Sequence, residues 1–244
     1  MSQVSPTPGS ENTAGSSGPG LASRLLGVIF SPRDAYTAIA ARPRALGALL
    51  VSAVILVAVN VIFLSTEVGQ NATLDQQLSV MKAFGVTVTE EMVQQIQARM
   101  AYAPYTTAAS ILVAVPVVCA AFAGLLLAIF TAVLGGGATF RQVYAVVAHS
   151  TIIGAIQQVF SMPIMYAREE IVSPTKLSVF FPMLSEDSFL TYLLGAIDLF
   201  YLWSLINVSI GVAVLYKRST VSVASLLLGI YAVIAVIIAA VRAF

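Results

Sequence analysis

Charge, cysteine and histidine are scarce in this chain of 244 residues. Only 9% of the residues are charged, whereas a soluble domain has roughly 25%. The net charge is +1, so nucleic-acid binding, which needs a concentrated basic surface, is not expected. One cysteine, Cys119, and one histidine, His149, are present. These counts exclude disulfide frameworks, CxxC redox sites and zinc clusters, and we expect no metal or other cofactor.

Catalytic motifs are also lacking. The glycines at 135–137 are not followed by the Gly-Lys-Ser/Thr of a phosphate-binding loop, and their flanks are long apolar runs, so a tight turn explains them better. No nucleophile elbow with a Ser–His–Asp pattern is visible. We therefore expect no enzymatic activity.

The first twenty residues are rich in Ser, Gly, Pro and Thr and have no hydrophobic periodicity. Such a segment buries too little to become ordered, so residues 1–20 are predicted to form a flexible tail. A secretory signal peptide is not expected, because the apolar stretch Leu25–Phe30 is shorter than the roughly 7–15 residues of its apolar region.

Apolar residues make up 59% of the chain and gather in long runs. A helix needs about 20 mainly apolar residues to cross a bilayer. The sequence therefore predicts an all-α integral membrane protein whose membrane domain, residues 45–244, has five transmembrane helices. The predicted spans are about 45–66, 106–134, 142–166, 189–216 and 220–241.

Lysine and arginine near short loops predict the direction of the spans. Seven basic residues lie on the side of the N-terminus and the two short turns: Arg24, Arg33, Arg42, Arg44, Arg141, Lys217 and Arg218. Five lie on the other side: Lys82, Arg99, Arg168, Lys176 and Arg242. We expect a multi-pass protein of the cell membrane with its N-terminus cytoplasmic and its C-terminus extracytoplasmic.

The segment 21–44 precedes the first span and is predicted to be an interfacial helical platform. Ser31 suits a helix cap, Pro32 the first helical position and Asp34 the positive helix start. Leu25–Phe30 is apolar enough to lie among lipid headgroups. A cytoplasmic interface is expected at three arginines: Arg33, Arg42 and Arg44. The alternative is a simple stop-and-orient sequence.

The long loop after the first span contains a second predicted helix, on the outer side. Thr87 and Glu90 have capping-box spacing, and Met92, Ile96 and Met100 fall on one face. Packing on the bundle or the membrane surface is expected, with a partner-binding helix as the alternative.

Polar residues inside the predicted spans are candidates for function, because their burial in lipid is costly. They are Asp198, His149, Asn207, Gln157, Gln158 and Asn60. Counting about 1.5 Å per residue gives a layer of His149 with Asn207 towards the cytoplasm and an outer layer around Asp198. Such layers could carry protons or cations, or hold helices together by hydrogen bonds. Ser150, Gly154 and Ser161, which share one helix face with Gln157, are expected to let helix backbones approach closely.

The segment SPRDAYTAIAARP, the five spans and the GGGATFRQVYAVVAHS stretch that opens the third span resemble the Yip-domain family. The resemblance covers about residues 22–241 and is closest to bacterial-type members. It implies an all-helical five-span fold, no catalysis, and membrane-organising or partner-binding work. The short Ser/Gly tail lacks the long acidic N-terminal region of the eukaryotic members, which argues against GTPase binding.

Two functions remain open. The favoured one is a membrane-organising scaffold whose partners are the bilayer and a membrane protein or a second copy of the chain. In that case mutation of Arg33, Arg42 and Arg44 should impair function, and Asp198→Asn should leave it intact. The alternative is a small transporter or channel built on the polar layer around Asp198. A membrane enzyme ranks third, for lack of a catalytic set.

Overall fold

A computed structural model describes residues 20–185 and 187–243. This part of the chain holds ten α-helices and a short 3₁₀ helix, η1 (Leu177–Phe180). The predicted flexible tail lies outside the described residues, except for Gly20, which precedes the first helix.

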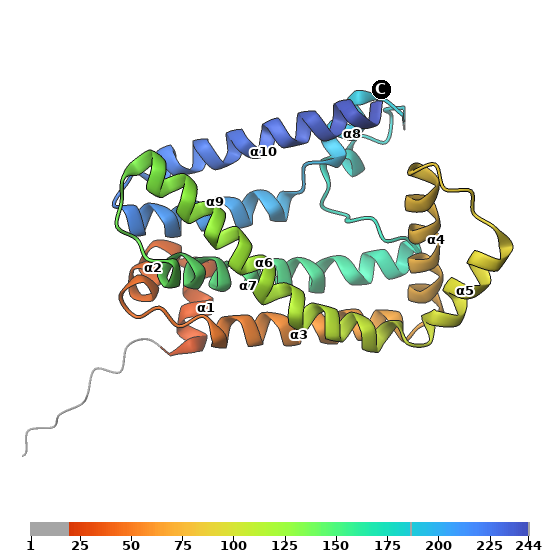
Figure 1. The fold of residues 1–244 in the computed structure, drawn as a ribbon, viewed down its shortest axis with the longest axis horizontal. Coiled ribbons are helices and arrows are strands. Elements are labelled where there is room, and N and C mark those ends of the chain that lie inside the picture. Colours follow the sequence, from red (N-terminus) through yellow and green to blue (C-terminus); the bar gives the residue numbers. More distant parts are fainter. Residues whose placement is uncertain (1–19, 186, 244) are drawn as a thin grey trace, which may run out of the picture.

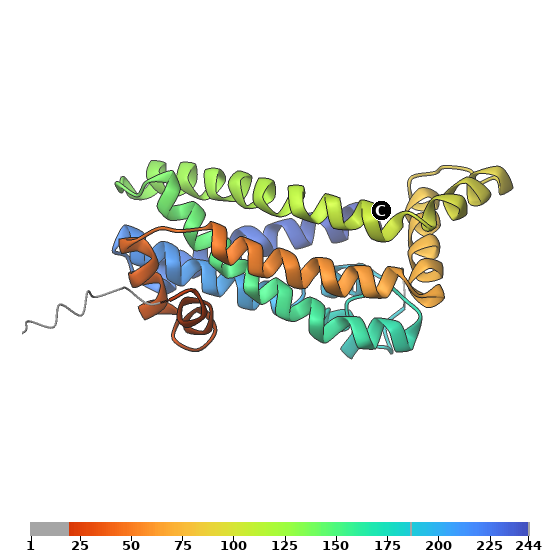
Figure 2. The same ribbon diagram turned by 90° about the horizontal axis from the view of Figure 1, so that it is seen from below.

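Five long apolar helices run side by side as a bundle (Figures 1 and 2). They are α3 (Leu46–Leu64), α6 (Ala103–Leu134), α7 (Phe140–Arg168), α9 (Leu199–Tyr216) and α10 (Thr220–Ala243). Each is long and apolar enough to cross a membrane, which confirms the all-helical, five-span fold. Helix α7 is the central one, because it packs against α3, α6 and α9 and 56% of its apolar window is buried. In α6 the buried share is 17%, as expected for a helix that faces lipid.

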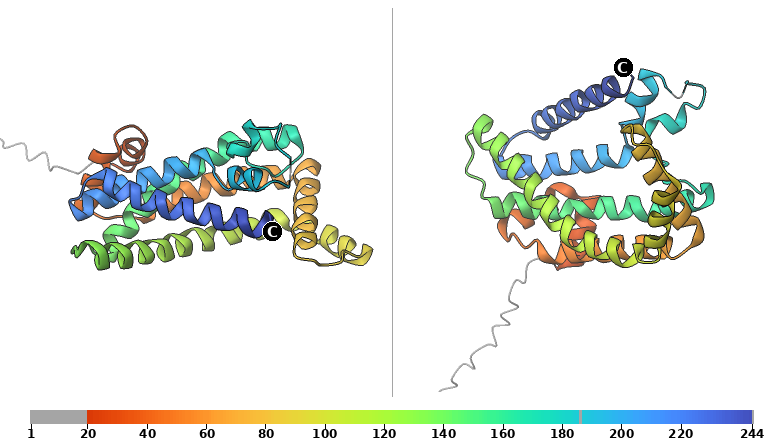
Figure 3. Two further views of the ribbon diagram at one scale, coloured as in Figure 1. Left: turned by 90° about the horizontal axis from the view of Figure 1, so that it is seen from above. Right: turned by 45° about the vertical axis from the view of Figure 1, so that its right-hand side comes forward.

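The bundle has two different ends (Figures 1 and 3). One, the α1/α2 end, carries α1 (Leu21–Phe30), α2 (Pro32–Ala41) and the two short turns that join α6 to α7 and α9 to α10. The predicted glycine turn is confirmed there, with Gly135 in the left-handed region at φ 61°. The other, the α4/α5 end, carries α4 (Glu67–Ala83), α5 (Glu90–Met100) and α8 (Phe189–Gly195).

The span predicted over 189–216 is two helices, and this expectation needs correction. Helix α8 ends at Gly195, and α9 begins only at Leu199. Asp198 is the N-cap of α9, in extended backbone conformation, and does not lie within a longer helix. Segment 175–177 pairs with the break, because Leu177 N donates to Ile197 O at 2.9 Å and Leu199 N to Thr175 O at 3.1 Å.

The platform before the first span is a pair of helices. The predicted helix with Pro32 at its start is α2, although the side chain of Ser31 caps nothing there. Val28 of α1 and Tyr36 and Ile39 of α2 are fully buried, because both helices pack on α7 and α2 also packs on α9.

The long connection between α3 and α6 holds one helix that was predicted and one that was not. The predicted helix is α5, but its cap is Thr89, whose Oγ1 accepts from Met92 N at 3.3 Å, and not Thr87. The unpredicted helix, α4, runs across the end of the bundle (Figure 1). Its polar sequence has little amphipathic pattern, and Gly69 allows it to fold back against the carbonyl of Phe63 at the end of α3.

Candidate functional site

The carboxylate of Asp198 is the best-connected polar group in the described part of the chain. Its Oδ1 accepts hydrogen bonds from Gln157 Nε2 at 2.9 Å, Phe200 N at 2.9 Å and Tyr201 N at 3.4 Å. Its Oδ2 accepts from Ser173 Oγ at 2.6 Å and Thr175 Oγ1 at 2.8 Å. Asp198 is 2% exposed. Two backbone N–H groups of the α9 start and three side-chain donors therefore compensate the buried carboxylate.

Tyr231 of α10 completes this cluster. Its hydroxyl donates to Ala196 O at 2.8 Å and accepts from Asp198 N at 3.4 Å. The cluster thus connects α7, the segment 173–175 and α10 to the start of α9. Among the described residues its contacts are those of a helix cap and a tether, with no group of three or more His, Cys, Asp or Glu that could hold a metal ion.

Asn207 connects the N-terminal helix pair to α9. It is 2% exposed, and its Nδ2 donates to Val28 O at 2.7 Å while its Oδ1 accepts from the hydroxyl of Tyr36. Burial raises the pKa of Tyr36 above its ordinary value, so the hydroxyl keeps its proton and remains a donor. One amide therefore satisfies two groups, one on α1 and one on α2.

Pro32 explains why Val28 needs this partner. A carbonyl in the last turn of a helix accepts a hydrogen bond from the N–H four residues later only if the helix continues. For Val28 O this donor would be the N–H of residue 32. Proline has no N–H, so the side chain of Asn207 supplies the hydrogen bond that Pro32 cannot.

The other predicted polar residues do not join these clusters within the described chain. His149 is fully buried and donates from Nδ1 to Ala145 O at 2.7 Å, not to Asn207, and its Nε2 has no partner there. Asn60 donates to Leu56 O of its own helix at 2.8 Å. Gln158, unlike Gln157, makes no hydrogen bond with Asp198. The structure therefore brings together Gln157 with Asp198 but not His149 with Asn207.

The three candidate arginines, Arg33, Arg42 and Arg44, are all exposed at the α1/α2 end. Two other arginines hold the backbone beside them by hydrogen bonds. Arg24, which is buried, donates to Arg42 O at 3.2 Å, and Arg141 donates from Nε to Pro43 O at 3.2 Å. The basic side chains thus project from a fixed segment.

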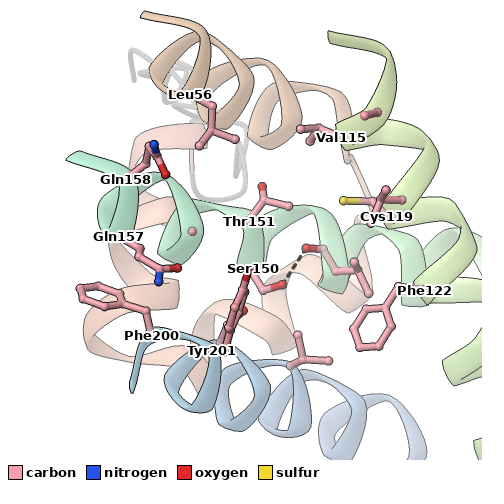
Figure 4. Close-up of a pocket in the computed structure, with 16 residues that line it drawn as sticks. Leu56, Val115, Cys119, Phe122, Ser150, Thr151, Gln157, Gln158, Phe200 and Tyr201 are labelled. Atoms are coloured by element: carbon pink, nitrogen blue, oxygen red, sulfur yellow. Dashed lines mark hydrogen bonds between the residues drawn. The ribbon is translucent and has the colours of Figure 1, made fainter. Parts of the chain in front are cut away.

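A cavity of about 510 Å³ lies between α3, α6, α7 and α9 (Figure 4). Helix α6 contributes Cys119 and Phe122, α3 contributes Leu56, and α9 contributes Phe200 and Tyr201. Helix α7 contributes the polar side of the lining, in which Thr151 donates to Ser52 at 2.8 Å. The cavity reaches Gln157 and Gln158 but is not lined by Asp198.

Sequence reasoning missed Tyr36, Ser173, Thr175 and Tyr231 as partners of the polar residues. Two signals were available. Gly195 followed by Asp198 has the spacing of a helix stop and a new N-cap, and Pro32 predicts an unpartnered carbonyl four residues earlier. The hydroxyl partners come from loops and neighbouring helices, so no local pattern indicates them.

These features define a multi-pass, all-helical membrane protein with five spans and a helix pair anchored at one end. The family model described as the Yip1 domain matches residues 26–242. The chain therefore belongs to the Yip1 domain family, which is generally one of non-enzymatic membrane proteins that interact with partners. No curated protein and no solved structure matches the chain.

Proposed function

We propose that the protein is a non-enzymatic membrane scaffold that presents a basic surface at its α1/α2 end to anionic lipid headgroups and partner proteins. The observation that carries this proposal is the anchored helix pair: Asn207 ties α1 and α2 to the bundle, while Arg33, Arg42 and Arg44 stay exposed. We place this end in the cytoplasm, because basic residues near short connections favour that side.

Exposed apolar side chains beside these arginines support contact with the membrane surface. Phe30, at the end of α1, is 79% exposed and Leu26 is 56% exposed. A surface helix buries such side chains at the boundary between headgroups and acyl chains, while nearby arginines meet phosphate. Each arginine near an anionic membrane surface contributes about 1 kcal/mol of binding free energy. Removing three arginines should therefore change lipid binding measurably.

The test is the retention of anionic lipid by a triple variant in which Arg33, Arg42 and Arg44 are each changed to Gln. Both proteins are reconstituted in vesicles of equal phosphatidylglycerol and phosphatidylcholine, extracted gently, and their bound lipids counted by mass spectrometry. We expect less phosphatidylglycerol per chain in the variant and unchanged phosphatidylcholine.

A matched control removes three basic residues at the other end, as Lys82→Gln, Arg99→Gln and Arg168→Gln, all at exposed positions. It should retain phosphatidylglycerol as the unmodified chain does. Equal loss in both triple variants, or no loss in the first, contradicts a lipid-binding surface at the α1/α2 end.

A small transporter or channel is the second candidate, because the cavity reaches Gln157, whose amide donates to Asp198. The five donors around that carboxylate support a structural role instead. Because these donors face a carboxylate, Asp198→Asn would weaken the fold whichever function is correct. This variant therefore does not distinguish a scaffold from a transporter, although the sequence led us to expect that it would.

A cysteine at position 158 separates them better, in a Cys119→Ala background. Gln158 lines the cavity and makes no hydrogen bond with the described residues. Labelling by a membrane-impermeant thiol reagent from either side would favour an aqueous path and transport. Absence of labelling, while a cysteine at the exposed Ser79 reacts, would favour the scaffold.

A further inference from the structure

We propose that the cavity between α6 and α9 binds one neutral long-chain lipid of the diacylglycerol type. Its volume of about 510 Å³ lies within the roughly 300–1,000 Å³ of small-molecule sites. This inference is independent of the basic surface, because the cavity and the arginines share no residue.

The cavity opens where lipid surrounds the bundle. Two of its lining residues, Val118 of α6 and Tyr201 of α9, are 62% and 61% exposed. A second cavity of about 300 Å³ adjoins it towards Tyr231 of α10, and Phe122 is among the residues that line both. Both α6 and α9 pack on α7, and an acyl chain would enter the space between them from the bilayer, past the exposed Val118 and Tyr201.

Part of the cavity volume is present because residue 154 is a glycine and has no side chain. A Cβ at this position would meet nothing within 4 Å, although the sequence pattern predicts that its small-residue face lets another backbone approach. Glycine inside a helix costs about 1 kcal/mol relative to alanine, and in membrane helices close packing commonly offsets this cost. No packing contact of that kind exists at Gly154 within the part of the chain that the structure describes, so the missing side chain leaves space for a ligand.

The polarity of the lining selects the kind of lipid. Side chains of α3 and α6 such as Leu56, Val115 and Phe122 are apolar, whereas the two amides, Gln157 and Gln158, lie together at one end (Figure 4). None of the described residues that line the cavity is charged. A charged headgroup would lose its hydration there without a counter-charge, so an uncharged polar group fits better.

Gln158 supplies the recognition chemistry. Its amide has no hydrogen-bond partner among the described residues, and it offers both a donor and an acceptor. A diacylglycerol carries a hydroxyl and ester carbonyls, which match both functions. The amides lie near the start of α9, because Gln157 donates to Asp198, the N-cap of that helix. The polar end of the cavity is therefore at one end of the span that α9 forms and not at its middle.

The experiment uses a photoactivatable diacylglycerol with a diazirine in one acyl chain, incorporated into vesicles that contain the full-length protein. A phosphatidylglycerol probe with the same chains is the comparison. We expect the neutral probe to crosslink α6 and α9 at cavity residues, and unlabelled diacylglycerol to compete. Mass spectrometry of the peptides gives the sites and yields.

Two variants test the site. Gly154→Leu fills the cavity and should lower crosslinking there about tenfold, which corresponds to about 1.4 kcal/mol. Gly229→Leu is the matched control on α10, because a Cβ there also meets nothing within 4 Å and the residue lies outside the cavity. Gln158→Leu preserves the space and should abolish the preference for the neutral probe.

Unchanged crosslinking in Gly154→Leu overturns the proposal, as does equal crosslinking of cavity residues by both probes in the unmodified chain, which is the behaviour of ordinary boundary lipid. If Gly154→Leu fails to fold, Gln158→Leu decides alone: a retained preference for the neutral probe contradicts the site.

Discussion

At the scale of single residues, the buried amide of Asn207 is the most informative group, because it compensates a carbonyl that Pro32 leaves unpartnered. Asn207→Ala should leave Val28 O and the Tyr36 hydroxyl unpaired. At about 1–3 kcal/mol for each buried group, the expected loss of unfolding free energy is about 2–6 kcal/mol. Thermal unfolding in detergent can be followed by the reaction of a thiol dye with the buried Cys119.

Asn60→Ala is the control for this prediction, because among the described residues the Asn60 side chain bonds only to Leu56 O of its own helix. Its cost should stay within about 1 kcal/mol. Equal melting temperatures of the two variants would show that the Asn207 hydrogen bonds do not stabilise the helix pair.

Asp198 is the second residue whose role can be tested, here by replacing a single carboxylate oxygen. Asp198→Asn replaces one acceptor oxygen by an NH₂ group, which would then face donors on Ser173 and Thr175 or on the start of α9. We expect a loss of about 1–3 kcal/mol, measured by the same thiol assay. The same change at Asp187, an exposed carboxylate, should be close to neutral. A fully stable Asp198→Asn protein would argue that the carboxylate is kept for another purpose.

At the scale of elements, α4 shows how a single glycine sets the direction of a helix. A Cβ on Gly69 would overlap the carbonyl group of Phe63 at the end of α3. Gly69→Ala should therefore release α4 from its place across the bundle and speed tryptic cleavage after Lys82, which lies in the last turn of α4. Gln76→Ala, at an exposed position on the same helix, should leave the cleavage rate unchanged. Equal rates in the two variants would mean that α4 does not depend on this close approach.

The helices that sequence reasoning identified and those it missed differ in their physical signal. Long apolar runs predicted all five spans, because the bilayer requires length and apolarity together. Helix α4 has no apolar run or strong periodicity, so its sequence alone gives little reason to expect a helix. The break between α8 and α9 was missed because Ala196 and Ile197 continue the apolar run and outweighed the spacing of Gly195 and Asp198. The capping geometry of Asp198 shows where the new helix starts.

At the scale of the whole molecule, the structure separates an end with α1, α2 and short turns from an end with α4, α5 and longer segments. The sequence predicted this division from loop lengths. It could not predict the cavity, which depends on how α6 and α9 are spaced on either side of α7. Among the described residues, the space around Gly154 results from that helix arrangement. The sequence pattern of small residues is identical whether or not a neighbouring helix packs against it.

The charge distribution predicts the direction of the chain in the membrane, and this prediction can be tested on the whole protein. We expect the α1/α2 end in the cytoplasm, because arginine and lysine beside short connections are retained on that side. In a Cys119→Ala background, Gly137→Cys marks the exposed α6–α7 turn and Ser79→Cys marks the exposed surface of α4. In intact cells an impermeant thiol reagent should label position 79 and leave position 137 unlabelled until the membrane is opened. The reverse pattern would place the arginine surface outside the cell, where it could not meet cytoplasmic partners or the inner leaflet, and the proposed scaffold function would fail with it.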